Sequence, residues 1–323
     1  MSETSGRTVL VTGAAGFIGS HLSEALIARG DRVVGVDNFD PYYDPAIKRR
    51  NVAALLDSGR FRLVEGDILD PQALQEAFCE PLACVIHLAA RAGVRPSIEQ
   101  PIQYARVNVE GTVALLEKTR EHGVARFLFG SSSSVYGAAN EVPFSEDQRI
   151  DRPISPYAAT KVAGEALCYT WHHLYDIPMV LLRFFTVYGP RQRPDLAIST
   201  FVRLLHAGKP IQQFGDGSSS RDYTYIDDIV RGIIAAADSD LDFEIINLGG
   251  STPVRLDELI AAVAAAVGVE PVVQVLDDQP GDVPRTCASV EKAKRLLGWE
   301  PQWSLADGLR EFVAWYRQQR AAV

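Results

Sequence analysis

Short apolar runs alternate with longer amphipathic stretches along the first half of the chain. The apolar runs are rich in β-branched residues and have the length of buried parallel strands, whereas the stretches between them have helical spacing. The predicted strands are Thr8–Val11, Arg32–Val36, Phe61–Val64, Cys84–Leu88, Arg126–Phe129 and Pro178–Leu182. The predicted helices are Ile18–Ala28, Pro71–Phe78, Val109–Arg120 and Tyr157–Leu174. This repeat predicts an α/β fold, a doubly wound parallel sheet that binds ligands at the carboxyl ends of its strands.

The pattern changes after Arg183, where turn-forming Gly, Pro and Ser residues separate shorter elements. Helical spacing returns in three later stretches: Leu256–Val267, Val290–Leu297 and Leu305–Gln318. We therefore expect residues 1–183 to form the domain that contains the sheet, with some later segments returning to it. Residues 184–323 are expected to form a smaller, mostly helical lobe that closes over the sheet edge and contacts substrate.

A glycine-rich turn, Gly13-Ala14-Ala15-Gly16-Phe17-Ile18-Gly19, directly follows the first predicted strand. Free amides at the start of the next helix, together with its dipole, favour a phosphate there. Asp37 ends the second strand run, where a carboxylate can bind the ribose hydroxyls of an adenosine and would repel a 2′-phosphate. Strand, turn, helix, strand and acid in this order predict NAD rather than NADP. The alternative is a glycine-rich turn in an ordinary α/β protein.

Composition narrows the class of protein. The formal net charge of -9 argues against nucleic acid or an anionic membrane as a partner, and no apolar stretch reaches membrane-spanning length. The segment Met1–Gly6 is too short and polar for a signal peptide. The four cysteines are scattered without metal-like pairing. We therefore expect a cytoplasmic enzyme without a metal.

A second motif adds candidate catalytic residues. Tyr157 and Lys161 follow Ser155-Pro156, a plausible helix start, and positions four apart share one face of a helix. The charge of Lys161, with that of an oxidised nicotinamide, is expected to lower the pKa of Tyr157. Ser132 lies in a serine run that ends the preceding strand and could bind a substrate hydroxyl. The alternative is a serine-rich turn beside a helical Tyr and Lys.

Together with Asp67-Ile68 and Leu88-Ala89-Ala90, these motifs resemble the extended short-chain dehydrogenases with a Rossmann-type fold, and within them the nucleotide-sugar 4-epimerases. The resemblance implies Ser132, Tyr157 and Lys161 as the catalytic set. It also implies NAD held by Gly13, Gly16, Phe17, Ile18, Gly19, Asp37, Asn38, Asp67, Ile68, Leu88, Ala89, Ala90, Tyr157 and Lys161.

In these epimerases Tyr157, as phenolate, would take the proton of the sugar 4-hydroxyl while a hydride passes to the nicotinamide. The 4-keto sugar then turns and receives the hydride on its other face, so NAD is not consumed. Related dehydratases and decarboxylases carry an acid after the position of Ser132, where this chain has Ser133-Ser134. We therefore favour an epimerase over a 4,6-dehydratase.

Three segments, at residues 41–48, 92–99 and 184–195, resemble the UDP-glucuronate 4-epimerases. A hexuronate carries a carboxylate, which an arginine and hydroxyl donors would satisfy. The candidate residues are Arg193, Thr186, Ser133 and Ser134, with Arg95 as a further partner. For the diphosphate and uridine, the resemblance points to Arg221, Asp282 and Arg285.

Two other function classes remain open. One is a different enzyme of the same fold, either a UDP-glucose 4-epimerase or a net dehydrogenase or decarboxylase. The other is a non-catalytic NAD-sensing protein, although such proteins typically lack the Tyr and Lys that this chain keeps. Relatives often form homodimers through two helices per subunit, here Val109–Arg120 and Tyr157–Leu174. A homodimer is therefore expected.

Overall fold

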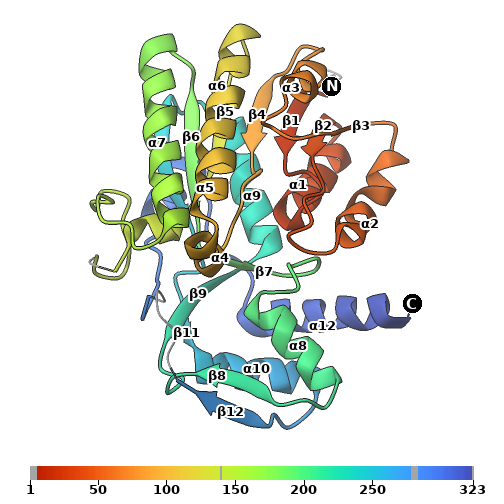
Figure 1. Cartoon of the computed structure of the whole chain (residues 1–323), viewed down its shortest axis with the longest axis vertical. Helices are drawn as coiled ribbons and strands as arrows, with labels where there is room; N and C mark the ends of the chain where they lie inside the picture. Colours follow the sequence, from red (N-terminus) through yellow and green to blue (C-terminus); the bar gives the residue numbers. More distant parts are fainter. Residues whose placement is uncertain (1–5, 139, 278–282, 322–323) are drawn as a thin grey trace.

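A seven-stranded parallel sheet forms the centre of the protein, in the strand order β10-β6-β5-β4-β1-β2-β3 (Figure 1). The computed structural model describes residues 6–138, 140–277 and 283–321. The strands are β1 (Thr8–Thr12), β2 (Arg32–Asp37), β3 (Phe61–Glu65), β4 (Cys84–His87), β5 (Phe127–Ser132), β6 (Met179–Phe184) and β10 (Phe243–Leu248). All six predicted strands are present, which confirms the predicted fold class. The sequence analysis missed β10, which pairs with β6 at the sheet edge.

Helices cover both faces of this sheet, because neighbouring residues of each strand point to opposite sides. Val9 and Val11 of β1 belong to one buried cluster, whereas Leu10 belongs to the other. The first cluster includes residues of α1 (Phe17–Ala28), α2 (Pro45–Leu56), α9 (Ile226–Asp238) and α11 (Glu291–Leu297). The second includes residues of α3 (Pro71–Ala77), α6 (Gly111–Glu121) and α7 (Pro156–Tyr175). Two apolar layers therefore fix the sheet between helices.

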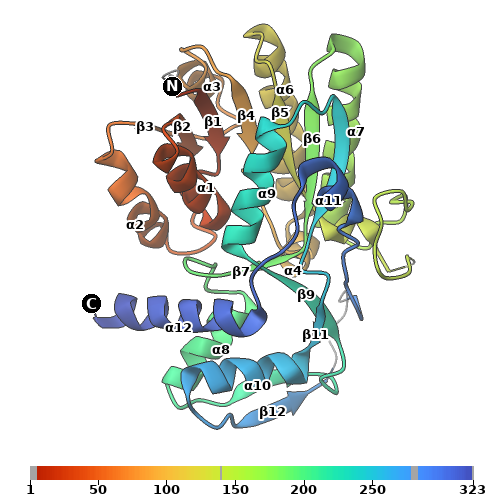
Figure 2. The ribbon, with the colours of Figure 1, turned by 180° about the vertical axis from the view of Figure 1, so that it is seen from behind.

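A smaller group of elements lies beyond one end of the sheet (Figure 2). It contains a three-stranded sheet in the order β11-β9-β7 and a two-stranded sheet of β12 and β8. These strands are β7 (Thr186–Tyr188), β8 (Ile211–Phe214), β9 (Ser220–Tyr225), β11 (Pro253–Arg255) and β12 (Val273–Leu276). The helices there are α8 (Ala197–His206), α10 (Leu256–Val267) and α12 (Leu305–Ala321). The bounds of α10 are those expected from its apolar spacing.

Chain segments from the second half return to the large sheet. The helix α9 packs against α1, and β10 extends the sheet beyond β6. Between β4 and α6 the chain forms α4 (Val94–Glu99), α5 (Pro101–Ala105) and a π-helical turn over Arg106–Glu110. The helix predicted over Val109–Arg120 therefore begins inside this turn and continues as α6.

The start of α7 is set by local chemistry. Ser155 caps the helix, since its hydroxyl accepts a hydrogen bond of 3.1 Å from the amide of Ala158, and Pro156 occupies the first helical position. Tyr157 and Lys161 thereby lie on the first turns of α7, beside the carboxyl end of β5. The predicted helix start is confirmed.

A buried ion pair joins α7 to two strands of the sheet. Arg183 on β6 donates two hydrogen bonds, of 2.9 and 2.7 Å, to Glu165 on α7, and their side chains are only 1% and 3% exposed. Glu165 also accepts a 2.6 Å bond from Ser131 at the end of β5. Arg183 donates further to the Tyr136 hydroxyl, which donates to Asn247 on β10. The network thus links β5, β6, β10 and α7.

Replacing Arg183 by Met should lower the free energy of unfolding by about 3–5 kcal/mol, because the carboxylate of Glu165 is left buried without its cation. The double variant Glu165→Gln/Arg183→Met should recover much of this loss, since no unpaired charge remains. Urea unfolding followed by circular dichroism measures both. A double variant less stable than Arg183→Met would show that the charge of Glu165 is not the cause.

Candidate active site

Three backbone segments lie in close contact at the glycine turn: the turn itself, the first residues of α1 and the loop after β4. Gly13 has φ +70°, and a Cβ there would lie 3.0 Å from the amide nitrogen of Ala89. A Cβ on Gly19 would lie 2.1 Å from the carbonyl oxygen of Gly13, so only glycine allows α1 to approach the turn this closely. The helix α1 begins at Phe17 with Gly16 as its N-cap. The amides of its first turn therefore lack intrahelical acceptors and can bind an anion.

Asp37 fixes the shape of this turn. Its carboxylate accepts hydrogen bonds from the amides of Ala15, at 3.0 Å, and Phe39, at 2.8 Å. Burial raises the pKa of Asp37, and the charge of Lys48 together with the two amide bonds opposes that rise. Each carboxylate oxygen keeps acceptor capacity after one amide bond. The residue can hold the turn and still accept from ribose hydroxyls.

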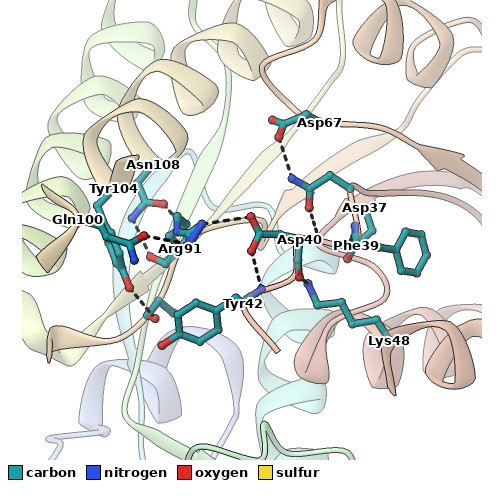
Figure 3. A network of polar contacts seen from close by, with 12 residues as sticks. Asp37, Phe39, Asp40, Tyr42, Lys48, Asp67, Arg91, Gln100, Tyr104 and Asn108 are labelled. Atoms are coloured by element: carbon teal, nitrogen blue, oxygen red, sulfur yellow. Dashed lines mark hydrogen bonds and ion pairs between the residues drawn. The ribbon is translucent and has the colours of Figure 1, made fainter. Parts of the chain in front are cut away.

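The other predicted cofactor residues lie on the neighbouring loops. Asn38 donates a 2.8 Å hydrogen bond to Asp67. Asp67 (Figure 3) lies in the loop after β3, which also contains Ile68. The amides of Leu88 and Ala89, which begin the loop that continues to Ala90, donate to the hydroxyl of Thr12 at 3.2 and 3.1 Å. Loops from the carboxyl ends of β1 to β4 therefore meet at one edge of the sheet.

The residues at this edge fit a bound dinucleotide. Gly13 and Gly19 form a cradle that any Cβ would fill. Nearby, the Nε atom of Arg91 is buried and has no hydrogen-bond partner in the described part of the chain. A cradle of free amides and a buried donor without an acceptor both suit a ligand with phosphate and ribose oxygens.

The predicted catalytic residues come together at the end of β5. Ser132 lies beside Tyr157, where it opposes the rise in the pKa of the phenol, and its hydroxyl donates a 3.2 Å hydrogen bond to Ser134. Lys161 donates a 2.6 Å hydrogen bond to the carbonyl oxygen of Gly130, and its ammonium lies 4.9 Å from the centre of the Phe129 ring. Burial lowers the pKa of Lys161 to about 8. The arrangement gives a phenol, a hydroxyl and a buried amine on one side of the sheet.

In this structure burial sets the direction of the pKa shift of Tyr157. It raises the pKa, and the groups that oppose the rise are Ser132 and the charge of Arg193. The ammonium of Lys161 is directed to Gly130. Desolvation of the phenolate therefore outweighs the nearby positive charge.

A chain of polar side chains that the sequence analysis missed lies behind the site. The ring of His87 lies between the hydroxyls of Thr12, 2.8 Å from Nδ1, and Thr112, 3.1 Å from Nε2. Thr12 already accepts two amides, so its proton goes to Nδ1, and Nε2 donates to Thr112. Burial lowers the pKa of His87 to about 3, which keeps the ring neutral. Thr112 then donates to the Asn108 carbonyl at 2.6 Å.

Asn108 connects the loop after β4 to the helix α7. Its side chain exchanges hydrogen bonds with the backbone of Arg91 at 2.8 and 2.9 Å and donates to Thr160 at 3.0 Å. Thr160 directly precedes Lys161 on α7. No local motif signals this role, because the partners of Asn108 lie 17 and 52 residues away.

The candidates for the substrate carboxylate surround the carboxyl ends of β5 and β6. Ser133 and Ser134 begin a short 3-10 helix, and the amide of Ser134 donates to Ser132 at 3.2 Å. Thr186 begins β7. Arg193 is bound by Asp195 through two hydrogen bonds of 3.0 and 2.7 Å.

Arg193 makes further contacts that tie three loops together. It donates to the carbonyl of Ala92 at 3.4 Å and to the hydroxyl of Tyr42 at 3.3 Å, and its guanidinium lies 4.8 Å from the centre of the Tyr42 ring. Most of its donors therefore already have protein acceptors. Asp195 is the side chain that a substrate carboxylate would compete with.

The candidates for the nucleotide lie on paired segments. Arg221 is on β9, and Ser220 forms a parallel bridge with Arg285. The neighbouring Asp222 is buried and accepts from the amides of residues 250, 251 and 288, so it fixes the returning segment beside β9. Arg95 lies on α4, with its guanidinium 5.5 Å from the centre of the Phe214 ring. Asp282 lies outside the described residues.

Residues 6–138, 140–277 and 283–321 contain no cluster of three or more His, Cys, Asp or Glu side chains arranged to hold a metal ion. Within the same ranges, no helix has the length and apolar character needed to cross a membrane.

The sequence model of the NAD dependent epimerase/dehydratase family matches residues 9–249. The chain belongs to this family. The match confirms the predicted family resemblance and the predicted dependence of the protein on NAD. The matched range extends from β1 to just beyond β10.

Proteins similar to this family member include enzymes with two sugar specificities. A UDP-glucuronate 4-epimerase of Thermodesulfobacterium geofontis is 44% identical over 311 residues, which cover 96% of each chain. The crystal structure of a Bacillus cereus UDP-glucuronic acid 4-epimerase, in complex with UDP-glucuronic acid and NAD, has a TM-score of 0.91 at 39% identity and covers 97% of this chain and 99% of the other. A Thermotoga maritima UDP-glucose 4-epimerase, with UDP-glucose, has a TM-score of 0.88 at 33% identity with the same coverage.

Ser132→Ala should shift the acid limb of the epimerase pH–rate profile upward by about one pH unit. With the phenolate of Tyr157 as the expected base, the rate rises with pH through the pKa of Tyr157, and removing a hydroxyl that lowers this pKa moves the rise to higher pH. Ser132→Thr keeps the hydroxyl and is the control, with an unshifted profile. If the acid limb of Ser132→Ala coincides with that of the parent, Ser132 does not tune Tyr157.

Proposed function

We propose that the protein is an NAD-dependent UDP-glucuronate 4-epimerase, which interconverts UDP-glucuronate and UDP-galacturonate through a 4-keto sugar. The observation that supports this proposal is that Ser132, Tyr157 and Lys161 lie together at the carboxyl end of β5, on the sheet that also carries the glycine turn. The identity of 44% to the Thermodesulfobacterium geofontis enzyme across nearly the whole chain supports the same sugar.

Three side chains have separate roles in proton transfer. Ser132 holds the sugar 4-hydroxyl, and Tyr157 takes its proton and later returns it. Lys161, held between Gly130 and the Phe129 ring, supplies positive charge beside the nicotinamide ribose. NAD, when bound, supplies the hydride acceptor and donor and is recovered after each turnover. Much of the rate enhancement comes from positioning of these groups.

An epimerase fits the end of β5 better than a dehydratase does. Elimination of water from the sugar needs an acid near the carbon that loses its hydroxyl. The residues that follow Ser132 are Ser133 and Ser134, whose hydroxyls are poor proton donors. Proton transfer therefore stays with Tyr157, and the 4-keto sugar is reduced again.

The hydroxyls of Ser133, Ser134 and Thr186, with the charge of Arg193, suit the carboxylate of a hexuronate. Oxidation at carbon four makes a β-keto acid, which can lose carbon dioxide. A firmly held carboxylate prevents the alignment that this loss requires. Asp195 lowers the positive potential of Arg193 and so tunes the strength of that hold.

The nucleotide would lie against Arg221 and Arg285, which the parallel bridge at Ser220 brings together. A guanidinium binds a diphosphate through two parallel hydrogen bonds. Asp282 is proposed to accept from the ribose hydroxyls of uridine, and Arg95 to add charge from α4. These arginines supply local positive charge in a chain of net charge -9.

The proposal extends to organisation and assembly. We infer a division at about residue 183 between NAD-binding and nucleotide-sugar-binding parts, with α9 and β10 returning to the first. A homodimer through α6 and α7 is supported by exposed large apolar side chains on α7, at Tyr169, Leu174 and Tyr175. The expected location is the cytoplasm.

Purified protein incubated with UDP-glucuronate should form UDP-galacturonate without net change in NAD, as followed by proton NMR and absorbance. A parallel reaction with UDP-glucose tests the main alternative. Conversion of UDP-glucose alone would assign a neutral-sugar epimerase, and lasting accumulation of NADH would assign a net dehydrogenase. No conversion of either sugar after NAD is added would contradict the proposed substrate.

Arg193→Ala should lower kcat/KM for UDP-glucuronate relative to UDP-glucose by about tenfold and release some UDP-pentose, because the carboxylate loses a charged partner. Asp195→Asn should change the ratio in the opposite direction, since Arg193 then lacks its competing carboxylate. NMR product analysis measures both effects. An unchanged ratio in both variants, with no pentose formed, would remove Arg193 from the specificity site.

A further inference from the structure

The loops after β4 and β2 lie on the two sides of the glycine turn. In the sheet order β4-β1-β2, the carboxyl end of β1 lies between the ends of the other two strands. Neighbouring strands are about 4.8 Å apart, so the outer two loops are separated by about 10 Å. The space between them, over the turn Gly13–Gly19, is where the diphosphate of a dinucleotide is expected.

One ion pair joins these two loops. Arg91 follows β4, Asp40 follows β2, and a nitrogen of the first lies 3.1 Å from a carboxylate oxygen of the second (Figure 3). Their side chains are 13% and 29% exposed, so solvent screens the pair only in part. Because β1 lies between β4 and β2 in the sheet, the contact between Arg91 and Asp40 passes across the carboxyl end of β1.

Both partners are held in place independently of each other. The second oxygen of Asp40 accepts the amide of Tyr42 at 2.9 Å, and the backbone carbonyl of Asp40 accepts from Lys48 at 3.0 Å. The backbone of Arg91 is fixed by the Asn108 side chain at 2.8 and 2.9 Å. Because Asp40 and the backbone of Arg91 are each held by other hydrogen bonds, the two side chains have little freedom to move apart.

Arg91 also retains an unused donor. Its buried Nε atom has no acceptor among the residues that the structure describes. A buried donor without an acceptor is unfavourable, so a ligand oxygen that reaches it would be bound favourably. The oxygens of a diphosphate or a ribose are suitable acceptors.

We propose that the Asp40–Arg91 pair is a bar across the cofactor groove that slows the release of NAD. NAD can leave in this direction only after the pair separates, and the Nε of Arg91 must give up its bond to the ligand. This inference rests on the proposed function, because an epimerase must keep one NAD through both hydride transfers. Asn108 connects the bar to Thr160, next to Lys161, so the bar and the catalytic helix share one support.

The test measures NAD release from the holoenzyme in the absence of sugar. Protein carrying NAD is mixed with excess alcohol dehydrogenase, ethanol and semicarbazide, which reduce each released NAD, and absorbance of NADH gives the release rate. Asp40→Asn keeps the acceptor for the Tyr42 amide but places an amide nitrogen or a neutral oxygen against Arg91. Release should be about tenfold faster in Asp40→Asn and in Arg91→Gln.

The double variant Asp40→Asn/Arg91→Gln should release NAD no faster than Arg91→Gln alone, because the two side chains act as one bar. The matched control is Glu80→Gln, which breaks the surface pair of Arg62 and Glu80, 3.0 Å apart and 35% and 28% exposed, outside the groove. This control should release NAD at the parent rate. Circular dichroism and the melting temperature of each variant without NAD report any general loosening.

Release rates in Asp40→Asn and Arg91→Gln within twofold of the parent would overturn the proposal. Fully additive effects in the double variant would overturn it as well, since they would show two independent contacts. Because no sugar is present, the result is separate from the proposed function. A bar that retains NAD in a protein inactive on UDP-glucuronate contradicts only the assigned substrate, and fast release from all variants of an active enzyme contradicts only the bar.

Discussion

The buried ion pair between Glu165 and Arg183 holds together the part of the molecule that would perform catalysis. Two charges this far from solvent are stable only when nearly every donor and acceptor is used. Here the carboxylate binds the guanidinium twice and also accepts from Ser131, while the guanidinium reaches Tyr136. The serine run, α7, β6 and β10 therefore keep one relative arrangement. Ser132, Tyr157 and Lys161 depend on that arrangement, because each lies on an element that the pair joins.

Burial shapes the chemistry of the site as strongly as the identity of its residues does. It lowers the pKa of Lys161 to about 8, lowers that of His87 to about 3 and raises those of Tyr157 and Asp37. In each case the charged form loses hydration. Nearby partners restore part of this loss for Lys161, Tyr157 and Asp37, whereas the charge of Lys161 lowers the pKa of His87 further. The charged forms of these groups are therefore destabilised by lost hydration, and a ligand of complementary charge can stabilise them. Perturbed ionisable groups gathered at one sheet edge are typical of catalytic sites.

Arginines organise the loops around this edge. Tyr42 lies close to both Arg91 and Arg193, whose guanidiniums are 5.7 and 4.8 Å from the centre of its ring. Each arginine also has a carboxylate partner, Asp40 or Asp195. The loops after β2 and β4 and the loop that contains Arg193 are therefore connected by a mixture of ion pairs and cation–π contacts. A chain of negative net charge can in this way present local positive charge to anionic ligands without leaving it unpaired.

The sequence by itself determined the strands of the sheet up to β6, the glycine turn, Asp37, the capped start of α7 and the pairing of Tyr157 with Lys161. These features rest on short-range physics: strand length and β-branching, glycine at a positive φ, a cap three residues from its amide, and helical spacing of four. Only the tertiary structure decided that β10 and α9 complete the sheet layers. The strand β10 contains the buried Asn247, whose side chain accepts from Tyr136, 111 residues away, and donates to the carbonyls of Phe144 and Ser289. Contacts between Arg91 and Asp40, or Asn108 and Thr160, join positions 51 or 52 residues apart, so no local pattern reveals them. The direction of the pKa shift of Tyr157 follows the same rule, because desolvation depends on every element packed around the phenol and not on the spacing of two residues along a helix.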